Sequence, residues 1–165
     1  MIKAWTARFA LVLSCTLMTV TPAEAQFWQC APFARGISGI DLYGRASSWW
    51  AQAAGRYARG KLPKVGAVLS FLATRQMRVG HVATVSRIVS AREVLLTHAN
   101  WSRRGAVERD VRAVDVSPAN DWSQVRVWYA PQRGLGTSRY PTNGFIYADR
   151  ASGVELASVA RDAAS

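Results

Sequence analysis

Residues 81–100 read HVATVSRIVSAREVLLTHAN, and they contain two β-branched segments separated by a short polar linker. Segments 81–89 and 93–100 are typical of strands, and Ser90-Ala91-Arg92 predicts the turn of a hairpin between them. Side chains alternate along a strand, so His98 and Asn100 share one face of the second strand. This stretch therefore predicts an antiparallel pair that carries both histidines of the chain.

The register of this hairpin decides which side chains meet. A loop of two or four residues places His81 opposite Asn100, with His98 diagonally near His81. A loop of three residues places His81 and Asn100 on opposite faces, because a slip of one residue exchanges the two faces of a strand. The register therefore tests whether these side chains can form one site.

The remaining elements place helices before strands. A short helix is expected over 29–35, ended by Gly36 and Gly39, and a second helix over 47–57. Further strands are expected at 67–73, 107–116, 124–129 and 145–147. This order predicts an α+β fold with N-terminal helices packed on an antiparallel β-sheet.

Length and composition limit the class of protein. A chain of 165 residues favours one domain, and a composition 50% hydrophobic and 19% charged excludes a disordered chain and a collagen-like repeat. The net charge of +11 suits contact with nucleic acid, an acidic polymer or a membrane surface. No nucleic-acid-binding signature is visible, so we expect no nucleic acid partner. A solvated basic surface is the simpler explanation of the charge.

Residues 1–25 have the pattern of a signal peptide. Lys3 and Arg8 precede an apolar run over 9–20, and Ala23-Glu24-Ala25 has the form of a cleavage site. A retained anchor and a lipid-modified Cys15 are the alternatives. Cleavage predicts an exported protein, periplasmic or secreted, with no membrane span and with Cys30 as its single cysteine.

Cys30 is the candidate nucleophile. It is expected at the start of the first helix, where free N–H groups stabilise a thiolate. His81 would act as the base, Asn100 or His98 would hold the tautomer of His81, and the Cys30 N–H with the Gln29 side chain would stabilise an oxyanion. The simpler alternatives are a buried thiol, a His81 bound by backbone and an Asn100 that caps its strand. Zinc is a further alternative, although two His and one Cys supply only three of the four ligands that a structural zinc site usually has.

At these residues the sequence resembles the CHAP family, the cysteine, histidine-dependent amidohydrolases/peptidases. The motifs occur in the family's order over about residues 28–147: QCAPFAR at 29–35, WWAQA at 49–53, PKVGAV at 63–68, GHVA at 80–83, HANW at 98–101 and YPTNGFI at 140–146. By motif position, Cys30 and His81 correspond to the nucleophile and the base. The position two before Asn100 is often acidic in this family and here is His98. The resemblance therefore implies Asn100 as the third residue, with His98 as its helper or substitute.

The resemblance implies a papain-like α+β fold and a cysteine hydrolase that cuts amide bonds of peptidoglycan. It divides the chain into a signal peptide (1–25), a hydrolase domain (26–147) and a tail (148–165). Peptidoglycan and anionic cell-wall polymer are the expected partners, with no cofactor or metal, and we expect a monomer. Trp50 and Trp101 are candidate walls of a substrate groove, although aromatic residues more often pack in a core. The alternative function is a secreted basic module that binds the cell wall without turnover.

Overall fold

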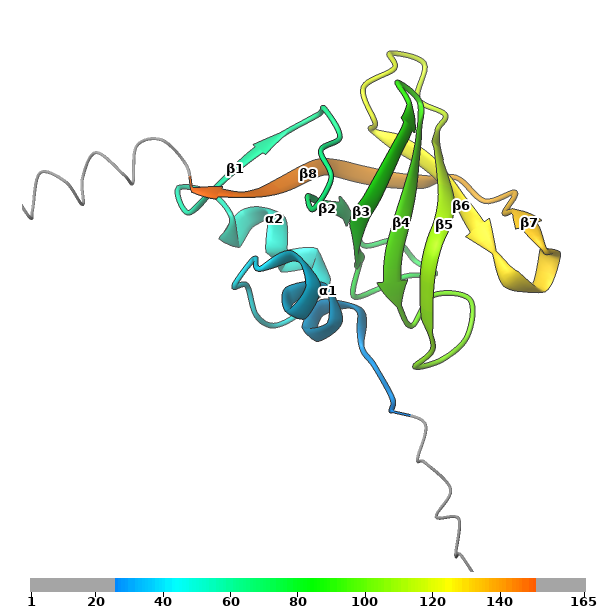
Figure 1. Cartoon of the computed structure of the whole chain (residues 1–165), viewed down its shortest axis with the longest axis horizontal. Helices are drawn as coiled ribbons and strands as arrows, with labels where there is room; N and C mark the ends of the chain where they lie inside the picture. The colour runs from blue at the N-terminus through cyan, green and yellow to red at the C-terminus, as the bar shows by residue number, and fades with distance from the viewer. Residues whose placement is uncertain (1–25, 151–165) are drawn as a thin grey trace, which may run out of the picture.

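The computed structural model describes residues 26–150, and these residues are mostly β-structure with few helices (Figure 1). The predicted signal peptide and residues 151–165 of the predicted tail lie outside the described residues. No helix within 26–150 has the length and apolar character needed to cross a bilayer. Residues 148–150, which were expected in the tail, are the end of the last strand.

The helical elements are short. They are α1 (Cys30–Ser38), the 3-10 turn η1 (Ala46–Ser48), α2 (Trp49–Gln52) and the 3-10 turn η2 (Ala130–Gln132). The strands are β1 (Tyr57–Gly60), β2 (Val68–Phe71), β3 (His81–Ser90), β4 (Glu93–Ala99), β5 (Val107–Asp115), β6 (Gln124–Tyr129), β7 (Gly134–Leu135) and β8 (Tyr140–Arg150).

The strands form one antiparallel sheet in the order β1-β8-β2-β3-β4-β5-β6-β7. β8 also pairs with β6, so the strands from β2 to β6 and β8 close into a barrel-like ring. In Figure 1, β8 is the long orange strand that runs behind the sheet from β1 towards β6. The predicted antiparallel sheet is therefore present, and its closure protects most strand edges from water.

Two apolar cores lie on the two faces of this sheet. Strand alternation sends Ala83 and Val85 into the barrel interior, together with Leu96 of β4, whereas Val82 faces the helices. The second core joins α1 and α2 to β2, β3 and β8, and α1 contacts β3 and β4. Figure 1 shows both helices together on one side of the sheet. Helix α1 is thereby held against the strand that begins at His81.

The elements differ from the sequence expectation in several places. Helix α1 continues through Gly36 to Ser38, so Gly39 alone ends it, and the strands β1 and β7 were not expected. The second helix was expected over 47–57, but α2 ends at Gln52, a turn follows with Gly55 at a φ of 72°, and β1 begins at Tyr57. The last strand was expected over 145–147, whereas β8 has 11 residues. Pro141 and Gly144 are typical of a loop, yet β8 forms a strand here because it pairs with β1, β2 and β6.

The β3–β4 hairpin has a two-residue loop, Ala91-Arg92, with Ser90 paired to Glu93. Two register shifts follow along the ladder, so that Thr84 pairs with Thr97. Each β-bulge adds one residue to one strand, and two bulges restore the original alternation of faces. Continued to the strand ends, this register brings position 81 level with position 100, the expected pairing, whereas the same loop without the two bulges would bring it level with position 102.

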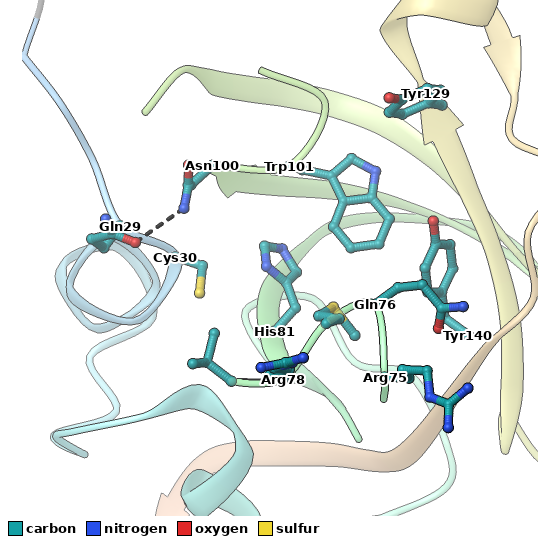
Figure 2. Close-up of a pocket in the computed structure, with 13 residues that line it drawn as sticks. Gln29, Cys30, Arg75, Gln76, Arg78, His81, Asn100, Trp101, Tyr129 and Tyr140 are labelled. Carbon is teal, nitrogen blue, oxygen red and sulfur yellow. Dashed lines mark hydrogen bonds between the residues drawn. The ribbon is translucent and has the colours of Figure 1, made fainter. Parts of the chain in front are cut away.

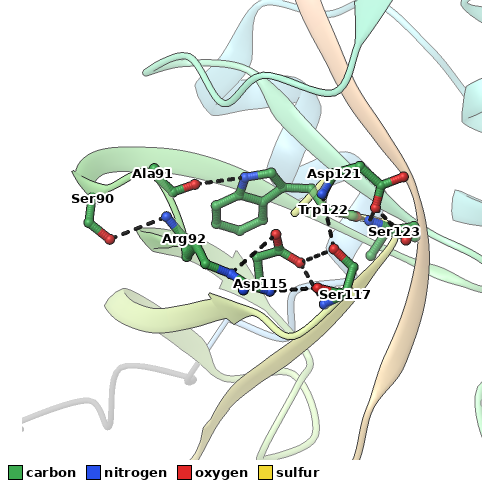
Figure 3. A network of polar contacts seen from close by, with 9 residues as sticks. Ser90, Ala91, Arg92, Asp115, Ser117, Asp121, Trp122 and Ser123 are labelled. Carbon is green, nitrogen blue, oxygen red and sulfur yellow. Dashed lines mark hydrogen bonds and ion pairs between the residues drawn. The ribbon is translucent and has the colours of Figure 1, made fainter. Parts of the chain in front are cut away.

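A polar cluster clamps the hairpin loop to the turn that follows β5 (Figure 3). The Asp115 side chain is fully buried, and its Oδ1 accepts the Ser117 N–H at 2.8 Å and the Ser117 hydroxyl at 2.6 Å. The Nε of Arg92 lies 3.7 Å from Asp115 Oδ2, and the Trp122 indole N–H donates to the Ala91 carbonyl at 3.2 Å. We call this cluster the hairpin clamp.

Candidate active site

A pocket of about 500 Å³ lies where the start of α1 meets the ends of β3 and β4 (Figure 2). It brings together residues that are far apart in the chain. Its lining consists of Gln29, Cys30, Arg75, Gln76, Met77, Arg78, Val79, Gly80, His81, Asn100, Trp101, Tyr129 and Tyr140. Five of the seven candidate residues therefore line a single cavity: Gln29, Cys30, His81, Asn100 and Trp101.

Cys30 is the first residue of α1, as expected, and it is buried. Its thiol lies near the N–H of Val82, the residue that follows His81, and Figure 2 shows Cys30 beside His81 at the pocket. Burial raises the pKa of the Cys30 thiol, and the N–H groups of Val82, Ala31 and Cys30 itself only partly oppose that rise. The helix start was expected to lower this pKa, but desolvation of the thiolate is the larger effect here.

His81 and His98 form a buried pair. His81 Nε2 and His98 Nδ1 are 3.0 Å apart, and the side chains are 3% and 0% exposed. Burial, and then the neighbouring His98, hold the pKa of His81 well below its ordinary value. Burial also lowers the pKa of His98. Both rings are therefore neutral at pH 7, and Nδ1 is the His81 nitrogen that the contact with His98 leaves available.

Gly80 sets the approach of the chain to His81. Its φ is +67°, and a Cβ at this position would lie 2.9 Å from the Phe71 carbonyl oxygen and from backbone atoms of Ser47. A side chain at position 80 would therefore strain the backbone and displace β2 or η1. Glycine here allows β3 to begin at His81 directly beside the pocket.

Asn100 does not hold His81, in contrast to the expectation. Its Nδ2 donates to Gln29 Oε1 at 3.0 Å, and its Oδ1 accepts the Gly105 N–H at 2.8 Å. The backbone of Asn100 has a φ of +61°, which turns the chain out of β4. His98 takes the position against His81 because Asn100 is already past the strand end.

Glu108 is a neighbour of His98 that the sequence did not single out. It lies on β5 directly across from His98, and Glu108 Oε2 is 3.2 Å from His98 Nε2. The contact is close but imperfectly aligned, and neither atom has another hydrogen-bond partner within residues 26–150. Partial burial raises the pKa of Glu108, but His98 and Ser102 outweigh it and hold that pKa below its usual value.

The two tryptophan candidates lie in different places. Trp101 lines the pocket and packs against both imidazoles, with ring centroids 4.8 Å from His81 and 5.5 Å from His98. Trp50 does not reach the pocket. It packs against the core beneath α1, and the Arg59 guanidinium lies 4.7 Å from its ring centroid. Trp101 therefore remains a candidate groove wall, whereas Trp50 lies outside the lining of this pocket.

Two arginines at the pocket were also missed by the sequence analysis. Arg75 and Arg78 belong to the loop between β2 and β3, and both are exposed. Neither forms a hydrogen bond or ion pair with another residue of the 26–150 segment, and the pocket lining contains no Asp or Glu. No motif marks these residues, because only the fold of the loop brings them to the cavity.

The zinc alternative finds no support in the described part of the chain. Among residues 26–150, no three side chains of His, Cys, Asp or Glu are grouped so that they could hold a metal ion. The described contacts of His81 and His98 are instead with each other, with Phe71, with Trp101 and with Glu108.

Comparison with known proteins agrees with the motifs. No curated protein matches the chain. The model of the CHAP domain matches residues 21–100, a segment that contains Cys30, His81, His98 and Asn100. The segment that carries these residues thus belongs to the CHAP domain family, the family that the sequence motifs indicated.

Proposed function

We propose that this protein is an exported cysteine hydrolase with a papain-like fold that cleaves amide bonds in peptidoglycan. The CHAP domain indicates a hydrolase of the peptidoglycan-degrading type. The observation that carries the proposal is the pocket that Cys30 shares with His81, whose Nε2 is bound by His98. The sequence pattern of residues 1–25 supports export.

The shared pocket supports a reaction of the following kind. Cys30 Sγ attacks the carbonyl carbon of the scissile amide while the thiol proton passes to His81 Nδ1. The imidazolium then protonates the leaving amine, and a thioester remains on Cys30. Water, deprotonated by His81, hydrolyses the thioester, and the proton returns to the sulfur as the thiolate leaves. Because the thiol and the imidazole are both neutral at rest, His81 acts as a general base rather than as half of a preformed ion pair.

The oxyanion of the tetrahedral intermediate needs donors near Cys30. The first N–H groups of an α-helix have no partner inside the helix, and the N–H of Cys30 is one of them. The Gln29 side chain is the second donor. Its Oε1 faces Asn100, so its amide hydrogens are free to turn towards the pocket.

The charge of the pocket supports an anionic substrate. Arg75 and Arg78 at its edge have no hydrogen-bond or ion-pair partner among residues 26–150, and no acidic side chain of these residues lines it. Unpaired guanidinium groups bind carboxylates through paired N–H donors. Peptidoglycan stem peptides and anionic cell-wall polymers carry such groups, which agrees with the net charge of +11.

Digestion of purified peptidoglycan, with the new amino termini identified by mass spectrometry, tests the proposal. The wild-type protein is expected to release defined termini, and Cys30→Ala is expected to release none while it still binds the wall. Cys30→Ser is the conservative control and should lose nearly all activity. Binding without any turnover by the wild-type protein would favour the wall-binding module instead. Inhibition by chelator, without an effect of thiol alkylation, would contradict cysteine catalysis.

A further inference from the structure

We propose that Glu108 is a positioning residue that acts through His98 to keep the His81 lone pair directed at Cys30. The effect on rate rests on the proposed function. The tautomers of His81 and His98 do not rest on it, because they can be measured without substrate.

Three side chains from neighbouring strands contact one another in a row. Glu108 on β5 is the cross-strand partner of His98 on β4, and His98 contacts His81 on β3. The two contacts are 3.2 Å and 3.0 Å long. The His98 side chain is fully buried and that of Glu108 is 8% exposed, so water cannot readily replace either contact.

The number of protons that each group carries decides which group donates in the contacts from His81 through His98 to Glu108. An ionised carboxylate only accepts hydrogen bonds, so the proton of His98 must lie on Nε2, which faces Glu108. A neutral imidazole carries one proton, so His98 Nδ1 accepts, and His81 Nε2 must donate to it. The second nitrogen of His81, Nδ1, is then unprotonated. This is the nitrogen that the mechanism requires to take the thiol proton.

The pKa directions agree with this proton order. Burial lowers the pKa of His98, which keeps its ring neutral, and contacts with His98 and Ser102 keep Glu108 ionised. The titratable groups around the His98 ring are His81 on β3 and Glu108 on β5, and Cys30 on α1 faces the same pocket. Asn100 cannot replace Glu108, because its amide is occupied by Gln29 and Gly105.

Glu108 also acts on the reaction itself. When His81 takes the thiol proton, the ring becomes positive and its Nε2–H bond to His98 strengthens. The carboxylate of Glu108 then stabilises that charge across one neutral ring, without accepting a proton. Removal of the carboxylate therefore weakens the base, and removal of the acceptor also frees both rings to reverse their tautomers.

Nitrogen NMR of the imidazoles tests the proton order directly. The chain contains only two histidines, so the spectrum of the ¹⁵N-labelled protein has two rings to assign. Both are expected as Nε2–H tautomers in the wild-type protein. Glu108→Leu removes the acceptor and is expected to produce a mixture in which Nδ1–H forms appear. A wild-type His98 protonated on Nδ1 would overturn the proposal.

Kinetics of the Glu108→Gln variant separates charge from hydrogen bonding. Glutamine keeps an acceptor oxygen, so the tautomers should persist, while kcat falls about tenfold because the charge is lost. The acid limb of the pH–rate profile should move to lower pH, because the anion that favours a protonated ring is absent. A merely structural role would leave that limb in place.

Glu93→Gln is the matched control, since Glu93 lies at the far end of β4 and pairs with Arg112. This variant should keep the wild-type tautomers, kcat and acid limb. If Glu108→Leu does not fold, the wild-type spectrum and the kinetics of Glu108→Gln still test the role of Glu108. A kcat within twofold of wild type and an unmoved acid limb in Glu108→Gln would refute the role of Glu108. Absence of hydrolysis by the wild-type protein, with the expected tautomers present, would instead refute the proposed function.

Discussion

Asn100 should support catalysis by orienting Gln29 and not by contacting His81. The backbone N–H of Gly105 can only donate, so the Asn100 atom at 2.8 Å from it is the carbonyl Oδ1. The amide nitrogen of Asn100 therefore faces Gln29 and must meet its oxygen Oε1, 3.0 Å away. This contact leaves the Gln29 amide hydrogens for the oxyanion, and its loss should lower kcat.

The magnitude follows from one neutral hydrogen bond. Such a bond contributes about 1 kcal/mol, which corresponds to about fivefold in rate, so we expect Asn100→Gly to lower kcat about fivefold. Gln29→Ala removes the oxyanion donor itself and should lower kcat about 100-fold or more. Helix α1 should tolerate that change, because the Gln29 side chain makes no capping hydrogen bond.

Comparison of Asn100→Gly with Asn100→Ala separates the loss of the amide group that orients Gln29 from the effect of backbone strain. Asn100 has a φ of +61°, a conformation that glycine adopts freely and that costs alanine roughly 1 kcal/mol. Asn100→Ala should therefore be less stable than Asn100→Gly in urea unfolding, while the two variants have similar kcat. This comparison assigns the loss of activity to the amide group.

A double-mutant cycle of peptidoglycan hydrolysis decides the question. If Asn100 acts through Gln29, then Gln29→Ala with Asn100→Gly should be about as active as Gln29→Ala alone. A further fivefold loss in the double variant would refute the reasoning. It would show that Asn100 contributes independently of Gln29, as a direct contact with His81 or with substrate would.

Three further predictions address substrate charge, acid stability and the hairpin clamp. Replacement of both Arg75 and Arg78 by Gln should raise KM about tenfold for substrates with free carboxylates, through loss of two exposed charge contacts, and leave kcat nearly unchanged. Arg87→Gln on the exposed end of β3 is the control, and equal KM values for amidated and free substrates in the wild-type protein would contradict an anion site. The two histidines have pKa values below those of the unfolded chain, so the free energy of unfolding should fall as pH drops below about 6.5, by up to about 1.4 kcal/mol per pH unit for each ring. Urea titrations between pH 7.5 and 5 measure this slope, and a flat profile would show that burial does not hold the rings neutral. Asp115→Ala should lower the free energy of unfolding by about 3 kcal/mol, through loss of two hydrogen bonds to a buried carboxylate, and Asp115→Asn by about half as much. A loss below 1 kcal/mol for Asp115→Ala at unchanged m-value would mean that the clamp contributes little.

Local sequence patterns were sufficient to predict most strands and the position of Cys30. The strand at 124–129 has the bounds expected from its alternation, and α1 begins at Cys30. These features depend on neighbours in the chain, which a sequence displays directly. The second helix and the strand β8 were mispredicted because their state depends on long-range pairing. Pro141 has no N–H to donate, but its carbonyl accepts the Leu72 N–H, and the neighbouring residues of β8 pair with β1, β2 and β6.

The sequence by itself determined that a cysteine and two histidines would be available and that the register of one hairpin would decide whether the histidines share a face. Only the tertiary structure decided which group stands behind His98. The β4–β5 ladder pairs Leu96 with Val111, and without a bulge it would bring Arg109 opposite His98. One register shift brings Glu108 there instead. Because a slip of one residue exchanges the faces of a strand, that single bulge places a carboxylate, and not a guanidinium, beside the buried imidazoles.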